Sequence, residues 1–188
     1  YFGKNCKYIE KHLDEIDAII ISDYGKGVII PELIEKLVAI KKEKNIPLIV
    51  DPKIEHFLLY KNVSVMTPNK KEAMEGSGLR ITDEKSLYAA GKKIKEMLDL
   101  DALIITRSEE GMSLFEKDEI INIPTLATEV YDVTGAGDTV VSVLALALSV
   151  GAKYSEAALL ANIAAGEVVK YIGAATISIE RLKELIKN

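Results

Sequence analysis

Short apolar runs alternate with amphipathic segments over the first 107 residues of the chain, and this alternation restricts the fold more than any other feature. Four runs are apolar enough for strands covered on both faces. They occupy residues 17–23, 46–51, 63–69 and 102–107. The intervening segments 31–45 and 81–100 carry apolar residues at helical spacing, with Pro31 at a helix start and Thr82 as the expected N-cap. Strands joined through helices predict one α/β domain over residues 1–188, with a mostly parallel sheet.

The remainder of the chain predicts a hairpin followed only by helices. Residues 113–123 read as two strands with a turn near Lys117 and Asp118. The most apolar stretch, residues 140–152, is shorter than the roughly 20 residues that cross a bilayer, so we expect a buried helix there. The three expected helices occupy residues 136–150, 154–171 and 178–187.

Composition excludes several classes of protein. Hydrophobic residues make up 48% of the 188 positions and charged residues 28%, which suits one folded domain and argues against disorder. The net charge of -5 and the absence of a basic run argue against a nucleic-acid partner. A single cysteine rules out a disulfide within the chain, and the first residues lack the apolar core of a signal peptide, so we expect a cytoplasmic protein without a membrane partner.

Polar residues stand at the ends of the predicted strands. Ligands of open parallel sheets bind beyond the carboxyl ends of the strands. That rule places Asp23, Asp51, Asn69, Arg107 and the 132–138 turn along one edge. Each strand-end acid alone also fits a turn or cap residue, but their shared edge predicts a binding site.

The turn "DVTGAGDT", residues 132–139, is the most distinctive local motif. Backbone N–H groups of Gly135, Ala136 and Gly137 at the start of a helix suit phosphate oxygens. The dinucleotide pattern G-x-G-x-x-G does not fit this turn, since Val140 occupies the last glycine position. The Walker loop does not fit "DYGKGVI" (23–29) either, because that segment lacks the spacing and the hydroxyl residue. A carboxylate at Asp138 would repel a phosphate bound there. Its position makes sense if Asp138 accepts the proton of a hydroxyl that attacks the phosphate. The alternative is an acid that only stabilises a helix N-terminus.

Together with three further motifs, this turn resembles the ribokinase-like (PfkB) carbohydrate kinases over essentially the whole chain. The other motifs are "TPNKKE" (67–72), "ITRSEEGMSLF" (105–115) and "LANIAAGEVV" (160–169). The resemblance implies a three-layer α/β/α ribokinase-like fold. It also implies that residues 1–188 are the C-terminal, nucleotide-binding portion of the kinase domain, with the N-terminal half and its β lid missing.

Within the family, "IISDYGKGVI", "VDPK" and "EVYDVTGAGDTVVSVLALAL" are most similar to the D-glycero-D-manno-heptose-7-phosphate kinases. That branch implies ATP-dependent phosphorylation of the anomeric hydroxyl to the 1,7-bisphosphate, a precursor of ADP-heptose and the lipopolysaccharide core. Ile54 departs from the glycine that often follows "DPK" in this branch. The alternatives are another PfkB sugar kinase, an ATP-binding fragment without turnover, or a purely structural or regulatory domain.

The resemblance also implies roles for individual residues. Asp138 is the expected catalytic base, and Gly135, Ala136 and Gly137 are the expected anion hole. Asn69 and Glu72 are expected to order Mg²⁺ and its waters, although the same pair fits a capping box at a helix start.

Further residues are assigned to the nucleotide, the substrate and a monovalent cation. The expected nucleotide loop consists of Thr106, Arg107, Ser108 and Gly111. Asn162 is expected near the base, unless it is only a polar residue on a packed helix. Asp132 is expected near a monovalent cation such as K⁺, and Lys26 and Lys53 contact a sugar phosphate or ATP phosphate, unless they are solvated. A homo-oligomer, or association with the missing half, is expected.

Overall fold

Six strands form one sheet in the order β1-β2-β3-β4-β5-β6 in a computed structural model that describes residues 2–126 and 129–187. The strands are β1 (Ile19–Ser22), β2 (Leu48–Asp51), β3 (Val65–Met66), β4 (Ala102–Thr106), β5 (Met112–Glu116) and β6 (Glu119–Ile123). Strands β1 to β4 are parallel, whereas β4, β5 and β6 pair antiparallel. The predicted mostly parallel sheet and the hairpin turn at Lys117 and Asp118 are therefore confirmed.

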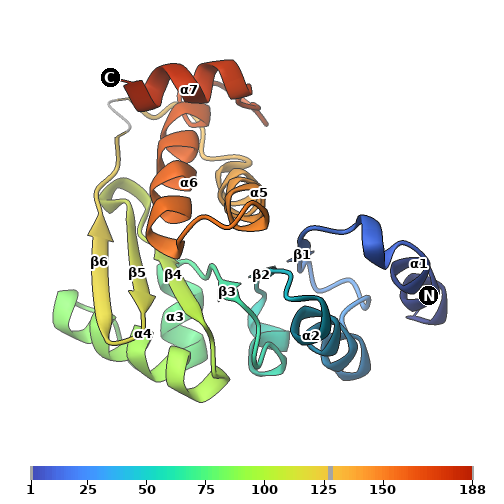
Figure 1. The fold of residues 1–188 in the computed structure, drawn as a ribbon. Coiled ribbons are helices and arrows are strands. Elements are labelled where there is room, and N and C mark those ends of the chain that lie inside the picture. Colours follow the sequence, from blue (N-terminus) through green and yellow to red (C-terminus); the bar gives the residue numbers. More distant parts are fainter. Residues whose placement is uncertain (1, 127–128, 188) are drawn as a thin grey trace.

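Helices cover both faces of this sheet (Figure 1). The α-helices are α1 (Phe2–Lys11), α2 (Pro31–Lys44), α3 (Lys70–Ser77), α4 (Glu84–Leu98), α5 (Ala136–Ser149), α6 (Tyr154–Val168) and α7 (Ile179–Lys187). Short 3₁₀ helices are η1 (Leu13–Glu15), η2 (Ile54–Leu59) and η3 (Ser108–Glu110). Helices α2, α3 and α4 lie on one face and α5 and α6 on the other, while α7 packs across α6. The three-layer α/β/α arrangement predicted from the sequence is present.

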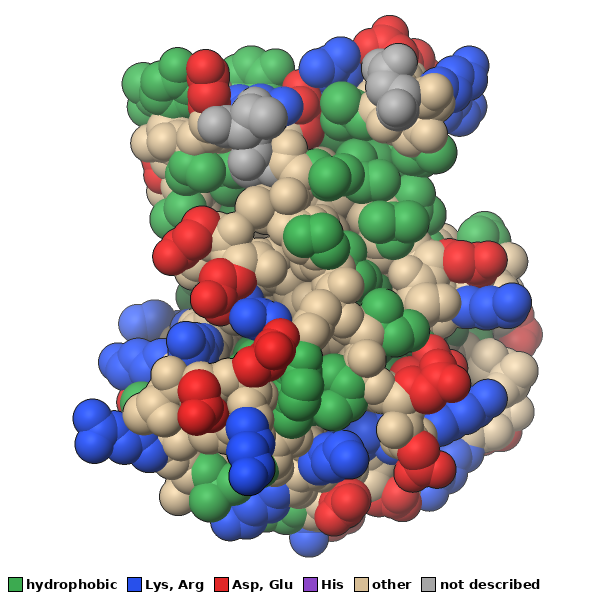
Figure 2. Space-filling model, turned by 90° about the vertical axis from the view of Figure 1, so that its left-hand side faces the viewer, with side chains coloured by type: hydrophobic (Ala, Val, Ile, Leu, Met, Phe, Trp, Pro, Cys, Tyr) green, Lys and Arg blue, Asp and Glu red, His purple; other side chains and the backbone are tan. Residues whose placement is uncertain are grey.

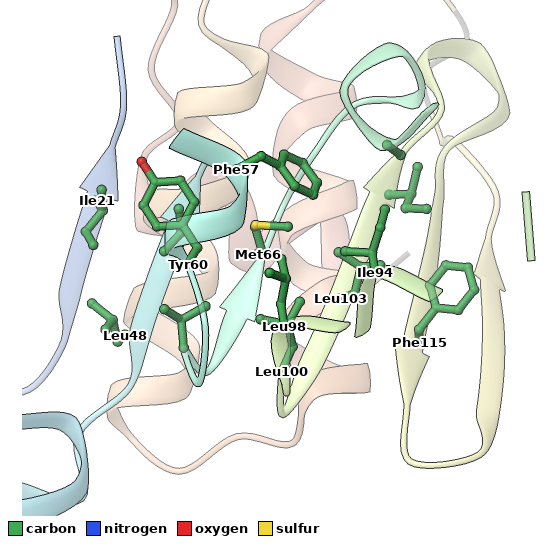
Figure 3. Packing of buried hydrophobic residues seen from close by; sticks show 14 of the residues in the cluster. Ile21, Leu48, Phe57, Tyr60, Met66, Ile94, Leu98, Leu100, Leu103 and Phe115 are labelled. Atoms are coloured by element: carbon green, nitrogen blue, oxygen red, sulfur yellow. The ribbon is translucent and has the colours of Figure 1, made fainter. Parts of the chain in front are cut away.

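Alternate residues of the central strands supply two separate cores. Leu48 and Val50 of β2 pack with α2 and α4, whereas Ile49 between them packs with α5 and α6. In β4, Leu103 belongs to the first core and Ile104 to the second. Figure 3 shows the first core, in which side chains from the sheet meet those of η2 and α4. Because β2, β3 and β4 are buried on both faces, their sequences are continuously apolar rather than alternating.

Three expectations about local structure need correction. The N-cap of α4 is Asp83 rather than Thr82, because the Asp83 carboxylate accepts the Ser86 N–H at 2.8 Å. Helix α6 ends at Val168, three residues before the predicted end. Residues 140–149 of the apolar stretch 140–152 belong to α5, but the stretch is not wholly buried: Leu146 in the helix is 68% exposed, and Val150, its C-cap, is 84% exposed.

Charged and apolar side chains are unevenly distributed over the surface. In Figure 2, acidic and basic side chains are interspersed over the lower part of the molecule, and hydrophobic ones gather higher up. No helix of the described residues has both the length and the apolar character needed to cross a membrane.

Strand β1 pairs on one side only among the described residues, and its Ile20 is 41% exposed. An open strand edge with exposed apolar groups favours pairing with another chain. We therefore expect the 188-residue chain to self-associate, and Ile20→Lys to weaken the association at least about tenfold, because a charge buried at an interface costs more than about 1.4 kcal/mol.

Sedimentation velocity over a range of concentrations measures this association. The matched control is Met97→Lys on α4, where an apolar side chain of similar exposure (37%) lies away from β1. A monomeric parent chain, or equal weakening by the two variants, would contradict the expectation.

Candidate active site

A cavity of about 570 Å³ opens at the carboxyl ends of β2, β3 and β4. Asp51, Thr67 and Thr106 line it from the strand ends. The opposite wall comes from the first turn of α5 and from α6. Its volume lies in the range of small-molecule sites, and its place at the strand ends is where open parallel sheets bind ligands.

The glycine turn forms the entry to α5. Gly135 is the N-cap with φ 80°, a left-handed conformation that favours glycine, and the helix begins at Ala136. Ala136 and Gly137 line the cavity, and a Cβ on Gly137 would meet nothing within 4 Å. The Ala136 N–H donates to the Val133 carbonyl at 3.2 Å, so the N–H groups just after it are better placed to receive an anion.

Asp138 lies in the first turn of α5 and is exposed. Its carboxylate Oδ1 accepts a hydrogen bond from the Tyr24 hydroxyl at 3.3 Å. Tyr24 follows β1, 114 residues away in the chain, and no sequence motif assigned it a role. Its position directly after the strand-end acid Asp23 was the available signal.

Asn69 and Glu72 form the capping box of α3. The Asn69 Oδ1 accepts the Glu72 N–H at 2.9 Å, and the Glu72 Oε2 accepts the Asn69 N–H at 3.0 Å. Both residues also line the cavity, where the Glu72 Oε1 lies 3.6 Å from the Lys53 Nζ. The capping interpretation is thus confirmed, and it leaves Glu72 facing the site.

Oxygen donors of Asn69, Glu72 and Asp51 are the type that Mg²⁺ prefers. Within the described residues, no three or more His, Cys, Asp or Glu side chains group closely enough to hold a metal ion. This donor set fits a cation that keeps several waters and takes further ligands from a phosphate, which is usual for Mg²⁺.

Asp51 lies in an environment that shifts its pKa. Burial raises its pKa, the neighbouring carboxylates of Glu72, Asp138 and Asp23 raise it further, and Lys53 lowers it, with a net value of about 6. Several negative charges therefore act on Asp51, and Lys53 offsets part of them. A cation in this region would relieve that repulsion.

The two lysines predicted as ligand contacts differ in position. Lys53 lines the cavity and pairs with Glu72. Lys26 is exposed in the loop after β1, between Gly25 and Gly27, and is not among the residues that line the cavity.

The loop after β4 forms another wall. Thr106, Ser108 and Gly111 line the cavity. Gly111 has φ 85°, and a Cβ there would lie 2.1 Å from the Ile123 carbonyl oxygen, so only glycine fits. Arg107 does not line the cavity. Its guanidinium instead contacts three side chains around the hairpin, Glu110, Ser113 and Asn122.

Helix α6 supplies the far end of the cavity. Asn162 is 4% exposed, and its side-chain N–H donates to the Pro124 carbonyl at 2.7 Å. Ala165 and Gly166 share its helix face because they follow at i+3 and i+4, a spacing that could have identified them. Further lining residues that the sequence analysis missed are Glu109, Met112, Thr125, Val130, Val133, Val140 and Val169.

Asp132 joins two loops beside the cavity. Its carboxylate accepts the hydroxyl and N–H of Thr134 at 2.7 and 2.9 Å and the Gly173 N–H at 2.9 Å. These hydrogen bonds, above all those from Thr134, hold the pKa of Asp132 below its usual range. Asp132 is not among the residues lining the cavity.

Comparison with known proteins gives related sequences over nearly the whole chain. Residues 2–181 match the pfkB family of carbohydrate kinases. The chain is 48% identical over 172 residues to the Bifunctional protein HldE of Geobacter sulfurreducens, and 45% identical over 184 residues to that of Syntrophotalea carbinolica. These matches include 91% and 97% of this chain but only 35% and 38% of the relatives. The chain thus spans little more than a third of their length.

Solved structures share the fold. Phosphofructokinase-2 from Escherichia coli in complex with potassium superposes with a TM-score of 0.81 at 18% identity, over 97% of this chain and 61% of that one. Arabidopsis thaliana ribokinase complexed with ribose and ATP gives 0.80 at 19% identity, over 98% and 59%. Ribokinase from Thermotoga maritima gives 0.75 at 27% identity, over 95% and 59%. The predicted ribokinase-like fold is confirmed.

The raised pKa of Asp51 predicts an effect of pH on stability. The folded chain binds the proton of this carboxyl more tightly than the unfolded chain, so stability from this group rises as pH falls from about 6 towards 4. Asp51→Asn removes the unfavourable charge. We expect it to raise the free energy of unfolding by about 1–3 kcal/mol at pH 7.5, and by less than half of that at pH 4.5.

Urea denaturation of parent and variant at both pH values, without nucleotide or divalent metal, gives the two differences. A difference that does not change with pH would contradict the predicted environment of Asp51.

Proposed function

The chain belongs to the pfkB family of carbohydrate kinases, and on this basis we propose that it is the nucleotide-binding part of an ATP-dependent kinase for D-glycero-D-manno-heptose 7-phosphate. Identities of 45–48% to proteins named Bifunctional protein HldE support this choice within the family, as do the heptose-branch motifs of the sequence. The observation that carries the proposal is the position of Asp138 in the first turn of α5, from which its charge acts on the cavity residue Asp51 at the edge of the sheet. Asp138 itself is not among the residues that line the cavity.

Asp138 is proposed to act as general base. Its carboxylate would take the proton of the anomeric hydroxyl while that oxygen forms a bond to the γ-phosphorus of ATP and the bond to the bridging oxygen of ADP breaks. Within the predicted anion hole of Gly135, Ala136 and Gly137, the backbone N–H of Gly137 would chiefly stabilise the negative charge on the transferred group, because the Ala136 N–H already donates to the Val133 carbonyl. The missing side chain of Gly137 leaves room for the phosphate.

The remaining cavity residues are proposed to hold the nucleotide and its metal. Thr106, Ser108 and Gly111 would border the nucleotide, and Asn162 would lie near the base. Lys53 would contact a phosphate, with Lys26 as a second candidate from the loop after β1. Arg107 acts indirectly, by holding the nucleotide loop against the hairpin.

Asn69 and Glu72 are the proposed residues for Mg²⁺, mostly through water, and the ion would neutralise phosphate charge. Asp132 is the proposed residue for a monovalent cation such as K⁺. Since the reaction uses ATP and a sugar phosphate, a cytoplasmic location is part of the same proposal.

The direct test uses protein expressed from the complete reading frame. ADP release is measured with ATP, Mg²⁺ and D-glycero-D-manno-heptose 7-phosphate, with fructose 6-phosphate and ribose as competing acceptors, and ³¹P NMR identifies the product. Turnover with another sugar alone would favour a different sugar kinase. ATP binding by calorimetry without turnover on any acceptor would favour the non-catalytic alternative.

Asp138→Asn tests the base. The amide keeps the shape of the side chain but cannot accept the proton, so phosphoryl transfer should fall about 10²–10⁴-fold. ATP affinity, measured by calorimetry, should change little. A variant that turns over within a few-fold of the parent removes Asp138 from the mechanism.

Glu72→Gln tests the metal role. Glutamine keeps the acceptor needed for the capping box but loses the charge, so the Mg²⁺ concentration for half-maximal rate should rise about tenfold while the melting temperature stays close to that of the parent. The matched control is Glu75→Gln, three residues after Glu72 on the same helix α3 and outside the capping box. Unchanged Mg²⁺ dependence with a lowered melting temperature would leave Glu72 a purely structural role.

A further inference from the structure

A buried carboxylate lies behind the candidate active site, outside the residues that line the cavity. Asp23 is 2% exposed and follows β1 directly. Its Oδ1 accepts the Gly25 N–H at 2.8 Å. Its Oδ2 accepts the Tyr60 hydroxyl at 2.7 Å and lies 2.8 Å from the His56 Nδ1. The two oxygens thus hold two different segments, the loop after β1 and the 3₁₀ helix η2.

The hydrogen bonds keep Asp23 charged. Burial alone would raise its pKa, but the bonds from Gly25, Tyr60 and His56 outweigh burial and hold the pKa below its usual range. Burial and the bond to Asp23 raise the pKa of Tyr60, so its hydroxyl remains a donor. A buried anion that loses a donor is strongly destabilised, so this cluster has one preferred arrangement.

Helix η2 gives the cluster a fixed base. Its Phe57 is 1% exposed, and Tyr60 directly after it is 0% exposed. In Figure 3, both rings lie inside the core beside the sheet, with the Tyr60 hydroxyl at the edge of the packed side chains. The loop after β1, in contrast, is exposed from Tyr24 to Val28, and Gly25 and Gly27 have φ values of 62° and 78°. The Asp23 carboxylate is what ties this loop to the core.

Tyr24 lies between Asp23 and Gly25, the two residues joined by the hydrogen bond within this loop. Its ring is 60% exposed, yet its hydroxyl reaches the Asp138 Oδ1 at 3.3 Å. A hydrogen bond on one carboxylate oxygen fixes the rotation of the group and leaves the other oxygen for a substrate hydroxyl. Neither Tyr24 nor Asp23, His56 or Tyr60 lines the nucleotide cavity.

We propose that Asp23, His56 and Tyr60 are positioning residues, which hold the loop after β1 so that Tyr24 orients the carboxylate of Asp138 for proton transfer. The inference rests on the proposed role of Asp138 as the base. It predicts that changes which leave the charge of Asp23 in place lower kcat without a loss in nucleotide binding, because Tyr24, His56 and Tyr60 do not line the cavity.

Tyr24→Phe tests the link to the base in the protein expressed from its complete reading frame. We expect kcat to fall about tenfold, the effect of losing one hydrogen bond to a charged group, with KM for ATP within about twofold. Combined with Asp138→Asn, the same change should cost almost nothing more, since the group that it orients is already lost. The matched control is Tyr131→Phe, which removes another exposed hydroxyl that donates to a carboxylate, Glu129, at 3.3 Å.

His56→Ala tests the anchor of the loop with a readout that does not need turnover. Trypsin cleavage after Lys26, followed by mass spectrometry under native conditions, should become at least about fivefold faster than in the parent, and cleavage after Lys117 in the β5–β6 turn serves as the internal reference. His56→Asn keeps a donor near the position of Nδ1 and should restore both slow cleavage and kcat. His12→Ala, which removes a histidine paired with Glu15, is the control.

Each outcome decides the proposal. Parent-like kcat in Tyr24→Phe, or a full tenfold loss on the Asp138→Asn background, overturns the orienting role. Unchanged cleavage after Lys26 in His56→Ala overturns the anchoring role. If Asp138→Asn itself leaves kcat unchanged, the proposed base fails and the orienting role fails with it, whereas the trypsin rates still decide whether Asp23 and His56 hold the loop.

Discussion

The parallel alignment of β1 to β4 is the constraint on which the candidate site depends. Parallel strands end at the same edge of the sheet, so residues from three separate segments, Asp51, Thr67 and Thr106, line one cavity. Helix α5 packs on the face next to β1 and β2, which brings its first turn to the same edge. Without this alignment, the glycine turn at the start of α5 would not lie near the polar groups at the strand ends.

The electrostatics of that edge are unfavourable in the chain alone. Asp51 is held near carboxylates of Glu72, Asp138 and Asp23, and its pKa of about 6 records the repulsion. Lys53 offsets only part of it. Sites that bind a metal and a phosphate commonly contain such electrostatic repulsion. A bound cation relieves the repulsion, and the free energy that is recovered contributes to binding.

The shared fold and the specific chemistry have different structural bases. Kinases with 18–19% identity superpose over nearly the whole chain, so the packing of alternating strands and helices tolerates extensive sequence change. The residues considered for chemistry lie instead in the loops after the strands and at the entry of α5. There, backbone conformation is restrictive: Gly111 and Gly135 both adopt positive φ, and Gly111 has no room for a side chain.

The sequence alone determined the order and type of most elements, the position of the hairpin and the edge at which polar groups gather. These follow from local rules, namely the period of apolar residues, turn residues and caps, which act between near neighbours in the chain. It also singled out Asp138, Asn69 and Glu72, because glycine turns and capping boxes are local motifs. The exact N-cap of α4 was misplaced by one residue, since Thr82 and Asp83 are both good caps and only the geometry of Ser86 separates them.

Only the tertiary structure decided which side chains meet across long stretches of chain. It turned Arg107 towards Ser113 and Asn122 rather than into the cavity, and it left Lys26 outside. It brought Tyr24 to Asp138, 114 residues apart, and enclosed Asp23 between its own loop and η2. No periodicity in the sequence encodes such contacts, because they depend on how the strands align and how the helices pack on them. The free energy of that packing comes from the whole core rather than from any one segment.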